Sequence, residues 1–154
     1  MVFEETHDTD YAREILTEPR CWRILSDDHN TPEVLIRDDL RYIVARDKGR
    51  TVALFILEGG PAPARAAVHF CFLPESWGRA TTIKTGTAFL EWVWKTTSIN
   101  WLMGGIPKYN RPAITLAKAC GFTVFCEERG VVSKHGRKHD LLVLQIKRPE
   151  YHVR

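Results

Sequence analysis

The chain has 154 residues, 44% of them hydrophobic and 27% charged, and carries a formal net charge of +3 at pH 7. This length suits a single domain spanning residues 1–154, with a core large enough to need neither disulfides nor metal. The composition excludes a largely disordered chain, and no apolar run reaches the ~20 residues of a membrane-spanning helix. We therefore expect a cytoplasmic protein without a membrane partner.

The first half of the chain predicts a strand, two helices and an antiparallel β-meander. Asp8 or Thr9 is placed to cap a helix that ends before Pro19, and residues 21–25 predict a second helical piece. The linker 48–50 is short enough for a hairpin between two of the strands. Apolar, β-rich runs predict strands at residues 2–6, 41–47, 51–59 and 66–74.

The second half predicts two more helices and three more strands. A long helix carries Ile83, Gly86, Leu90 and Val93 at steps of three and four. A buried strand is expected at 101–105, and two closing strands at 122–132 and 140–148 flank a basic loop at 133–139.

The stretch between these strands, KYNRPAITLAKACGF, predicts a short helix with clear ends. Asn110 is a good N-cap, and Pro112 falls in the first turn, where a missing N–H costs nothing. Gly121 is expected to end the helix in a left-handed conformation. The apolar face of this helix consists of Ala113, Leu116, Ala117 and Cys120.

The order of elements resembles that of the GNAT superfamily, the acyl-CoA-dependent N-acyltransferases. Asn110, Ala113, Leu116, Gly121 and Phe122 are similar to the family's Asn, small helical residue and terminal Gly-Phe pair. In the order of its elements, the resemblance covers nearly the whole chain. In amino-acid sequence, it covers only about residues 66–128. It implies an α+β (α/β/α-like) fold, with a mixed, mostly antiparallel sheet of about seven strands and about four flanking helices. It also implies acetyl-CoA as co-substrate.

In the family, a loop of small residues at a helix N-terminus offers backbone N–H groups to the CoA pyrophosphate. Here the matching segment is LPESWGRATTIKTG, in which Trp77 replaces a Gln or Arg, Ala80 the first Gly, and Thr82 the second Gly or Ala. A Cβ obstructs close approach of a backbone to its ligand, and Ala80 is the smallest such obstruction. The alternative is that the segment only caps a helix, through Ser76 or Thr81. The resemblance assigns cofactor binding to Phe72, Leu73, Trp77, Gly78, Arg79, Ala80, Thr81, Thr82, Asn110 and Ala113.

Acyl transfer to an amine requires removal of a proton from the amine and, often, an acid for the leaving thiolate. The family commonly places a Tyr in this acid role, where the chain has Ala117. Tyr109 is a candidate catalytic residue from the other side of the cleft, although an aromatic before a helix also serves as a packing staple. His69, predicted to share a strand face with Cys71, is a candidate general base, or alternatively a hydrogen-bonded, half-exposed histidine.

The cysteines and the His-containing basic segment give little indication of function. The cysteines Cys21, Cys71, Cys120 and Cys126 form no CxxC pair and are expected to be reduced. His135 and His139 fall in a charged hairpin tip without a cysteine, so no metal is expected. That short basic segment is also usually just solvated, so nucleic acid is not expected as a partner.

Two classes of function remain open. In the first, the protein is an acyltransferase that passes an acetyl group from acetyl-CoA to the amine of a small molecule or protein. In the second, it resembles the inactive GNAT-like proteins of tailed phages and serves as a head-assembly or virion scaffold, whose partner is a virion protein or a second copy of itself. Three features favour the second class: Ala117 in place of the family's Tyr, Ala80 in place of its Gly, and the segment RPAITLAKACGF, which is similar to those phage proteins.

Overall fold

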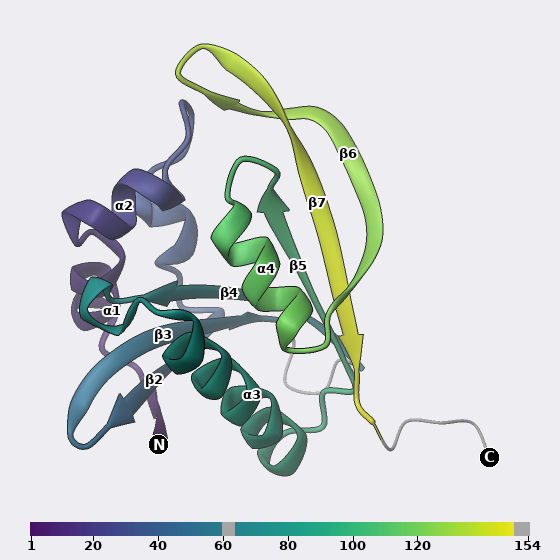
Figure 1. Ribbon diagram of the computed structural model, residues 1–154. Coiled ribbons are helices and arrows are strands. Elements are labelled where there is room, and N and C mark those ends of the chain that lie inside the picture. Colours follow the sequence, from purple (N-terminus) through teal and green to yellow (C-terminus); the bar gives the residue numbers. More distant parts are fainter. Residues whose placement is uncertain (60–63, 150–154) are drawn as a thin grey trace.

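The computed structural model describes residues 1–59 and 64–149, and these residues form one seven-stranded sheet with four α-helices (Figure 1). The strands are β1 Val2–Thr6, β2 Leu40–Asp47, β3 Arg50–Glu58, β4 Arg65–Phe72, β5 Trp101–Pro107, β6 Thr123–Lys134 and β7 Arg137–Lys147. The helices are α1 Thr9–Leu16, α2 Pro19–Leu25, α3 Arg79–Thr96 and α4 Arg111–Ala119, with 3₁₀ turns η1 Pro32–Leu35 and η2 Pro74–Ser76. The predicted α+β fold class is confirmed.

The sheet is antiparallel except at one place. Its order is β1-β2-β3-β4-β5-β7-β6, and only β4 and β5 run parallel. These two strands pair over three positions, from Arg65↔Trp101 to Ala67↔Met103. Beyond that point β4 continues to Phe72 and β5 to Pro107 without pairing to each other. The two strands therefore part, as Figure 1 shows, and α4 lies beside the place where they separate.

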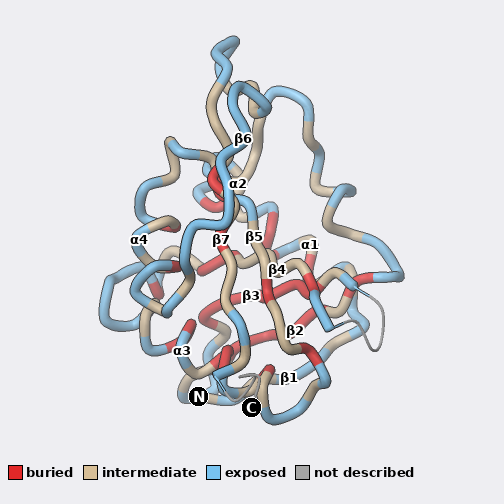
Figure 2. Tube along the Cα trace, turned by 90° about the vertical axis from the view of Figure 1, so that its right-hand side faces the viewer, coloured by how far each residue is buried: buried red, intermediate tan, exposed pale blue. Residues whose placement is uncertain are grey.

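Helices cover both faces of the sheet, because the central strands carry apolar side chains on both faces. On β3, Phe55 and Leu57 join the cluster that contains Phe89 of α3, and the Phe55 and Phe89 rings stack 3.9 Å apart. Their neighbours Leu54 and Ile56 point to the opposite face and pack with α1 and α2. A strand buried on both faces is expected to read as one continuous apolar run, as residues 51–57 do. Figure 2 shows the buried residues gathered along these central strands, whereas the β6–β7 end is mostly exposed.

The ends of α4 follow the prediction. The Asn110 side chain accepts a hydrogen bond from the Ala113 N–H at 3.4 Å, so Asn110 is the N-cap. Gly121 has φ +105°, a conformation that favours glycine. A Cβ added to Gly86 of α3 would lie 2.7 Å from the Cys120 Sγ, so the two helices pack closely at this point.

Three predicted boundaries are wrong. The second helix starts at Pro19, because proline fits the first turn and the Glu18 carboxylate accepts from the Arg20 and Cys21 amides. The strand predicted for 66–74 ends at Phe72, because Pro74 opens a 3₁₀ turn. The basic loop predicted for 133–139 is a two-residue turn, since His135 and Gly136 both have positive φ and the flanking charged residues pair across the hairpin. The predicted loop 59–65 lies partly outside the described residues.

Candidate active site

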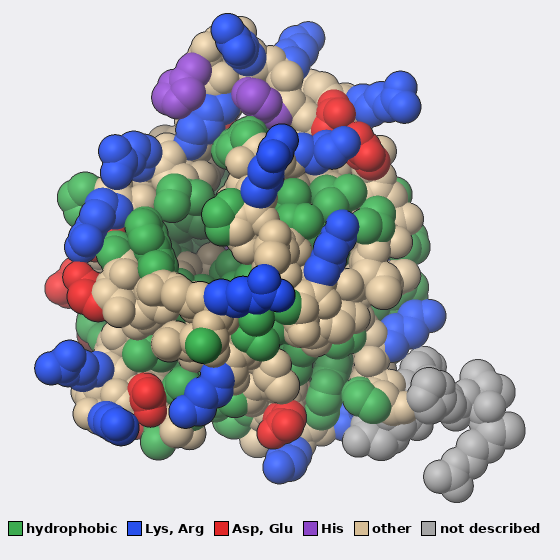
Figure 3. Space-filling model, in the orientation of Figure 1, with side chains coloured by type: hydrophobic (Ala, Val, Ile, Leu, Met, Phe, Trp, Pro, Cys, Tyr) green, Lys and Arg blue, Asp and Glu red, His purple; other side chains and the backbone are tan. Residues whose placement is uncertain are grey.

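A cleft of about 670 Å³ opens where β4 ends, between the N-termini of α3 and α4. Seven of the ten residues predicted to bind a cofactor line it: Phe72, Trp77, Gly78, Arg79, Thr82, Asn110 and Ala113. Leu73, Ala80 and Thr81, predicted with them, are not among its lining residues. Figure 3 shows the hollow walled by hydrophobic side chains, with Lys and Arg side chains around it. The structure thus brings most of the predicted cofactor residues together from three separate segments.

The first turn of α3 presents main-chain N–H groups without a side-chain cap. Gly78 is the N-cap residue, with φ +153°, and the prediction that Ser76 or Thr81 caps the helix is wrong. The first intrahelical bond runs from the Thr82 N–H to the Gly78 carbonyl at 3.0 Å. The N–H groups before Thr82 therefore have no acceptor within the helix, and the helix dipole and the Arg79 side chain add positive potential at this end. This arrangement suits a bound anion.

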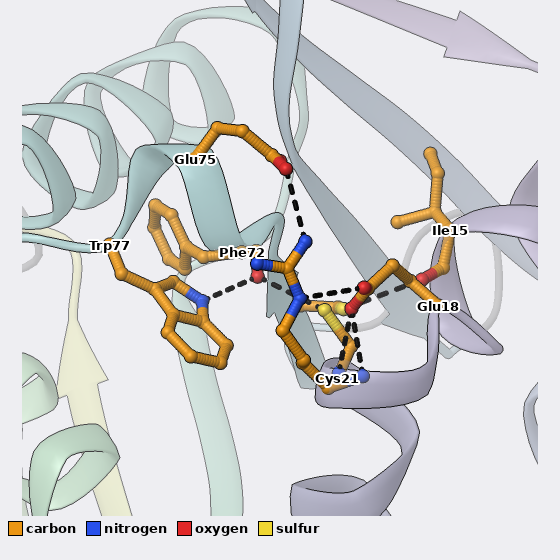
Figure 4. Close-up of polar contacts among 8 residues, drawn as sticks. Ile15, Glu18, Cys21, Phe72, Glu75 and Trp77 are labelled. Carbon is orange, nitrogen blue, oxygen red and sulfur yellow. Dashed lines mark hydrogen bonds and ion pairs between the residues drawn. The ribbon is translucent and has the colours of Figure 1, made fainter.

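The β4 edge that faces the gap is available to a ligand at its main chain. The Leu73 N–H donates to the Val52 carbonyl at 3.0 Å, on the β3 side. Because main-chain groups alternate along a strand, those of Phe70 and Phe72 face the opposite way, toward the gap. The Phe72 carbonyl accepts from the Trp77 indole Nε1 at 2.8 Å and from the Cys21 thiol at 3.3 Å (Figure 4). The Trp77 indole, 47% exposed, is thereby fixed at the wall of the cleft.

An ion-pair network joins α2 to η2 outside the lining of the cleft. Arg20 bridges the carboxylates of Glu18 and Glu75 at 2.9 and 3.1 Å, joining the two segments (Figure 4). Beneath them, hydrogen bonding with Cys21 and burial both raise the pKa of the Cys71 thiol, so this thiol stays protonated and is a poor nucleophile. All four cysteines are free, in agreement with the prediction.

A second cavity, of about 290 Å³, adjoins the cleft at the end of β4 and reaches the α2–η1 side of the sheet. Both cavities are lined by Phe70, Phe72 and Asn110. His69 lines only the second, and alternation along β4 places it on the same face as Cys71, as predicted. Ala117 also lines this cavity and supplies no acid there.

The His69 imidazole is held by a carboxylate. Its Nε2 lies 3.1 Å from Glu58 Oε2, and its side chain is 37% exposed. Glu58 also accepts from Arg37, and hydrogen bonds from Arg37 and His69 lower the pKa of Glu58. An imidazole oriented by an ionised carboxylate and open to a cavity is the arrangement of a general base.

Tyr109 occupies a different place from the one its predicted role requires. Its ring packs edge-on against His139, with centroids 4.8 Å apart, and the Lys134 Nζ lies 5.4 Å from the ring centroid. Burial, followed by the charges of Asp27 and Asp28, raises the pKa of Tyr109. Within the described part of the chain, Tyr109 is not a lining residue of either cavity.

Sequence reasoning missed the wall that α2 and η1 build on the second cavity. Its residues are Trp22, Ile24, Leu25, Asn30, Thr31, Val34 and Leu35, and no helix or strand was predicted between residues 25 and 41. The apolar residues that follow Pro32 were the available signal. Across residues 1–59 and 64–149, no group of three or more His, Cys, Asp or Glu is placed to hold a metal ion, and no helix is long and apolar enough to cross a membrane.

Comparison with known proteins places this geometry in a family. The family model described as an acetyltransferase (GNAT) domain matches residues 3–123. No curated protein sequence matches the chain.

Several solved structures share the fold. A spermidine N-acetyltransferase from Vibrio cholerae, in complex with CoA and spermine, is 14% identical with a TM-score of 0.77, covering 97% of this chain and 96% of that one. A ribosomal-protein-alanine N-acetyltransferase from Brucella melitensis is 20% identical with a TM-score of 0.66, covering 96% and 100%. A ribosomal-protein-S5-alanine acetyltransferase from Vibrio fischeri is 12% identical with a TM-score of 0.72, covering 99% and 97%. Because the family model spans most of its length, the chain belongs to the acetyltransferase (GNAT) domain family, whose co-substrate is acetyl-CoA.

Proposed function

We propose that the protein transfers the acetyl group of acetyl-CoA directly to an amine, with His69 as general base. The observation that carries the proposal is the parting of β4 and β5 beside the N-terminus of α3. It leaves a cleft on one side, suited to the cofactor, and a cavity containing His69 on the other. The two meet at Phe70 and Phe72, where thioester and amine would come together.

The groups around the cleft suit the parts of CoA. The unpaired N–H groups at the start of α3, with Arg79, suit the diphosphate. The main-chain groups of Phe70 and the Phe72 N–H face the gap and suit the amide groups of the pantetheine arm. The Phe72 carbonyl, by contrast, is already engaged by Trp77 and Cys21. Of the residues named here, the family resemblance assigns cofactor binding to Phe72, Trp77 and Arg79.

The chemical step then follows from the arrangement. The amine nitrogen gives a proton to His69, directly or through water, and attacks the thioester carbonyl carbon. A main-chain N–H on the β4 edge is the available donor for the oxyanion. Collapse of the tetrahedral intermediate breaks the C–S bond, and the CoA thiolate takes a proton from the His69 imidazolium or from water, since Ala117 cannot donate one.

The second reading, an inactive virion scaffold of phage type, shares this fold and differs only in whether the site works. Ala80 and Ala117 favour it, and the open cleft and the His69–Glu58 pair favour the enzyme. Nothing in the fold alone decides between them.

Release of the CoA thiol from acetyl-CoA in the presence of amines tests the proposal. We expect amine-dependent thiol release from the wild-type protein and a fall in kcat of about 10²-fold or more for His69→Gln. Tyr109→Phe is the matched control, because its ring lies away from both cavities, and it should keep kcat within about twofold. Equal rates for His69→Gln and the wild type would show that His69 is not the general base. Absence of thiol release with every amine would favour the scaffold reading.

A further inference from the structure

We infer that the acceptor is a primary amine on an apolar body, aromatic or branched alkyl, and not a polyamine. The inference rests on the proposed function, because it concerns the acceptor side of the same site. It comes from the chemistry of the second cavity, on the side formed by α2 and η1.

The wall of this side is apolar. Trp22, Leu25 and Leu35 face the space opposite Ile56 of β3. The polar side chains in the lining are His69, Asn30, Thr31 and Asn110, and none of them carries a negative charge. Among the described residues, no Asp or Glu lines the cavity. An apolar substituent gains from such a wall, whereas a second ammonium group would lose its hydration there without a counter-ion.

The carboxylates of the adjacent loop are already engaged. Asp27 Oδ1 accepts from the His29 and Asn30 amides, both at 2.8 Å. The Asp28 carboxylate accepts from the His135 and Gly136 amides, both at 2.9 Å. Both acidic groups therefore serve to fold the loop and fix the hairpin, and neither Asp27 nor Asp28 is among the residues that line the cavity.

The two other carboxylates near this wall are paired with arginines. Glu33 of η1 makes an ion pair with Arg13 of α1. Glu58 pairs with Arg37 as well as with His69. A polyamine would have to compete with an arginine guanidinium for each of these carboxylates. Bidentate arginine–carboxylate pairs, such as that of Arg13 and Glu33, are among the stronger ion pairs.

Binding of amines to the protein saturated with CoA tests the inference without requiring turnover. In calorimetric titrations we expect 2-phenylethylamine to bind at least tenfold more tightly than spermidine. Spermidine binding as tightly or more tightly, or absence of phenylethylamine binding, would overturn the inference. Thiol release from acetyl-CoA reports the proposed function separately: turnover with spermidine as the better acceptor would overturn the acceptor class and leave the acyltransferase standing.

A pair of valine variants locates the effect. Val34 lines the cavity and is 54% exposed, and Val2 on β1 is 55% exposed and is not among the lining residues. Val34→Glu adds a carboxylate without a partner to the wall, so the preference for phenylethylamine over spermidine should fall by about threefold or more. Val2→Glu should leave the preference unchanged. The same change in both variants, or in neither, would contradict an acceptor wall at η1.

Discussion

At the scale of single residues, the start of α3 shows how a departure from the family pattern is accommodated. Ala80 and Thr82 stand where the family favours glycine, but the residue whose backbone needs glycine here is Gly78. Its φ of +153° combines with ψ 136°, and no heavy atom lies within 4 Å of an added Cβ. A side chain at position 78 is therefore opposed by the backbone conformation and not by crowding.

Gly78→Ala should disturb cofactor binding through this conformation. We expect a loss of stability of about 1–3 kcal/mol and a roughly tenfold rise in the Kd of CoA, because the N–H groups after position 78 shift. Gly49→Ala is the matched control, since Gly49 also has positive φ (+77°) and free space, in the turn between β2 and β3. Denaturant unfolding and calorimetry with CoA separate the two effects. If both variants lose CoA affinity alike, or neither does, Gly78 has no special part in the site.

Residue predictions succeeded where they depended on local geometry. Strict alternation along β4 placed His69 on the Cys71 face, and capping preferences placed Asn110 at the start of α4. Tyr109 could not be placed in the same way, because its surroundings, His139 and Lys134, come from a hairpin about 25 residues later in the chain. The Trp77 indole bond to the Phe72 carbonyl depends on the η2 turn, which the sequence did not predict: its first residue, Pro74, was expected at the end of a strand.

At the scale of elements, the β6–β7 hairpin joins segments that are far apart in the chain. Its turn contacts the loop between α2 and η1: the Asp28 N–H donates to the Ser133 carbonyl at 2.8 Å, and the Asp28 carboxylate accepts from the turn amides. Figure 1 shows the tip of the hairpin extending past the rest of the sheet, toward the α2 side. The hairpin thus fixes one wall of the acceptor cavity from outside. The sequence predicted a hairpin tip here but not this contact, because a short run of charged residues such as 133–139 is usually just solvated.

Asp28→Asn should loosen this contact in a pH-dependent manner. Hydrogen bonds from the Gly136 amide and then the His135 amide lower the pKa of Asp28 below its ordinary value of 3.8. The folded pKa is the lower one, so the stabilisation is complete above the unfolded value and is lost as pH falls through the folded value. The wild type should therefore melt at a higher temperature than Asp28→Asn at neutral pH, and this difference should shrink below about pH 3.8.

Asp38→Asn, an exposed change in the same region of sequence, serves as the control for Asp28→Asn. It should not reproduce the pH-dependent difference in melting temperature. Faster amide exchange at Ser133 to Gly136 should accompany the Asp28 change alone. A melting difference that persists unchanged into acid would show that the carboxylate charge does not hold the hairpin.

At the scale of the whole molecule, the proposed function depends on the place where β4 and β5 stop pairing within the sheet. The apolar runs and their order predicted seven strands and four helices, because strand alternation and helix capping are local properties of sequence. The size of the cleft and the partner of each carboxylate were beyond such reasoning, since they depend on how β4 and β5 part and on contacts between distant segments. In the sequence, Ala117 and Ala80 argue against a working site. In the structure, the open cleft is evidence for one.

Unfolding free energy measured with and without acetyl-CoA tests the central claim, that the space between the parted strands holds the cofactor. At a ligand concentration about a hundred times its Kd, acetyl-CoA should stabilise the protein by about 2.7 kcal/mol, and free CoA should also stabilise it. The stabilisation should be reduced in Gly78→Ala and retained in Gly49→Ala. Unchanged stability at millimolar concentrations of both ligands would contradict the account.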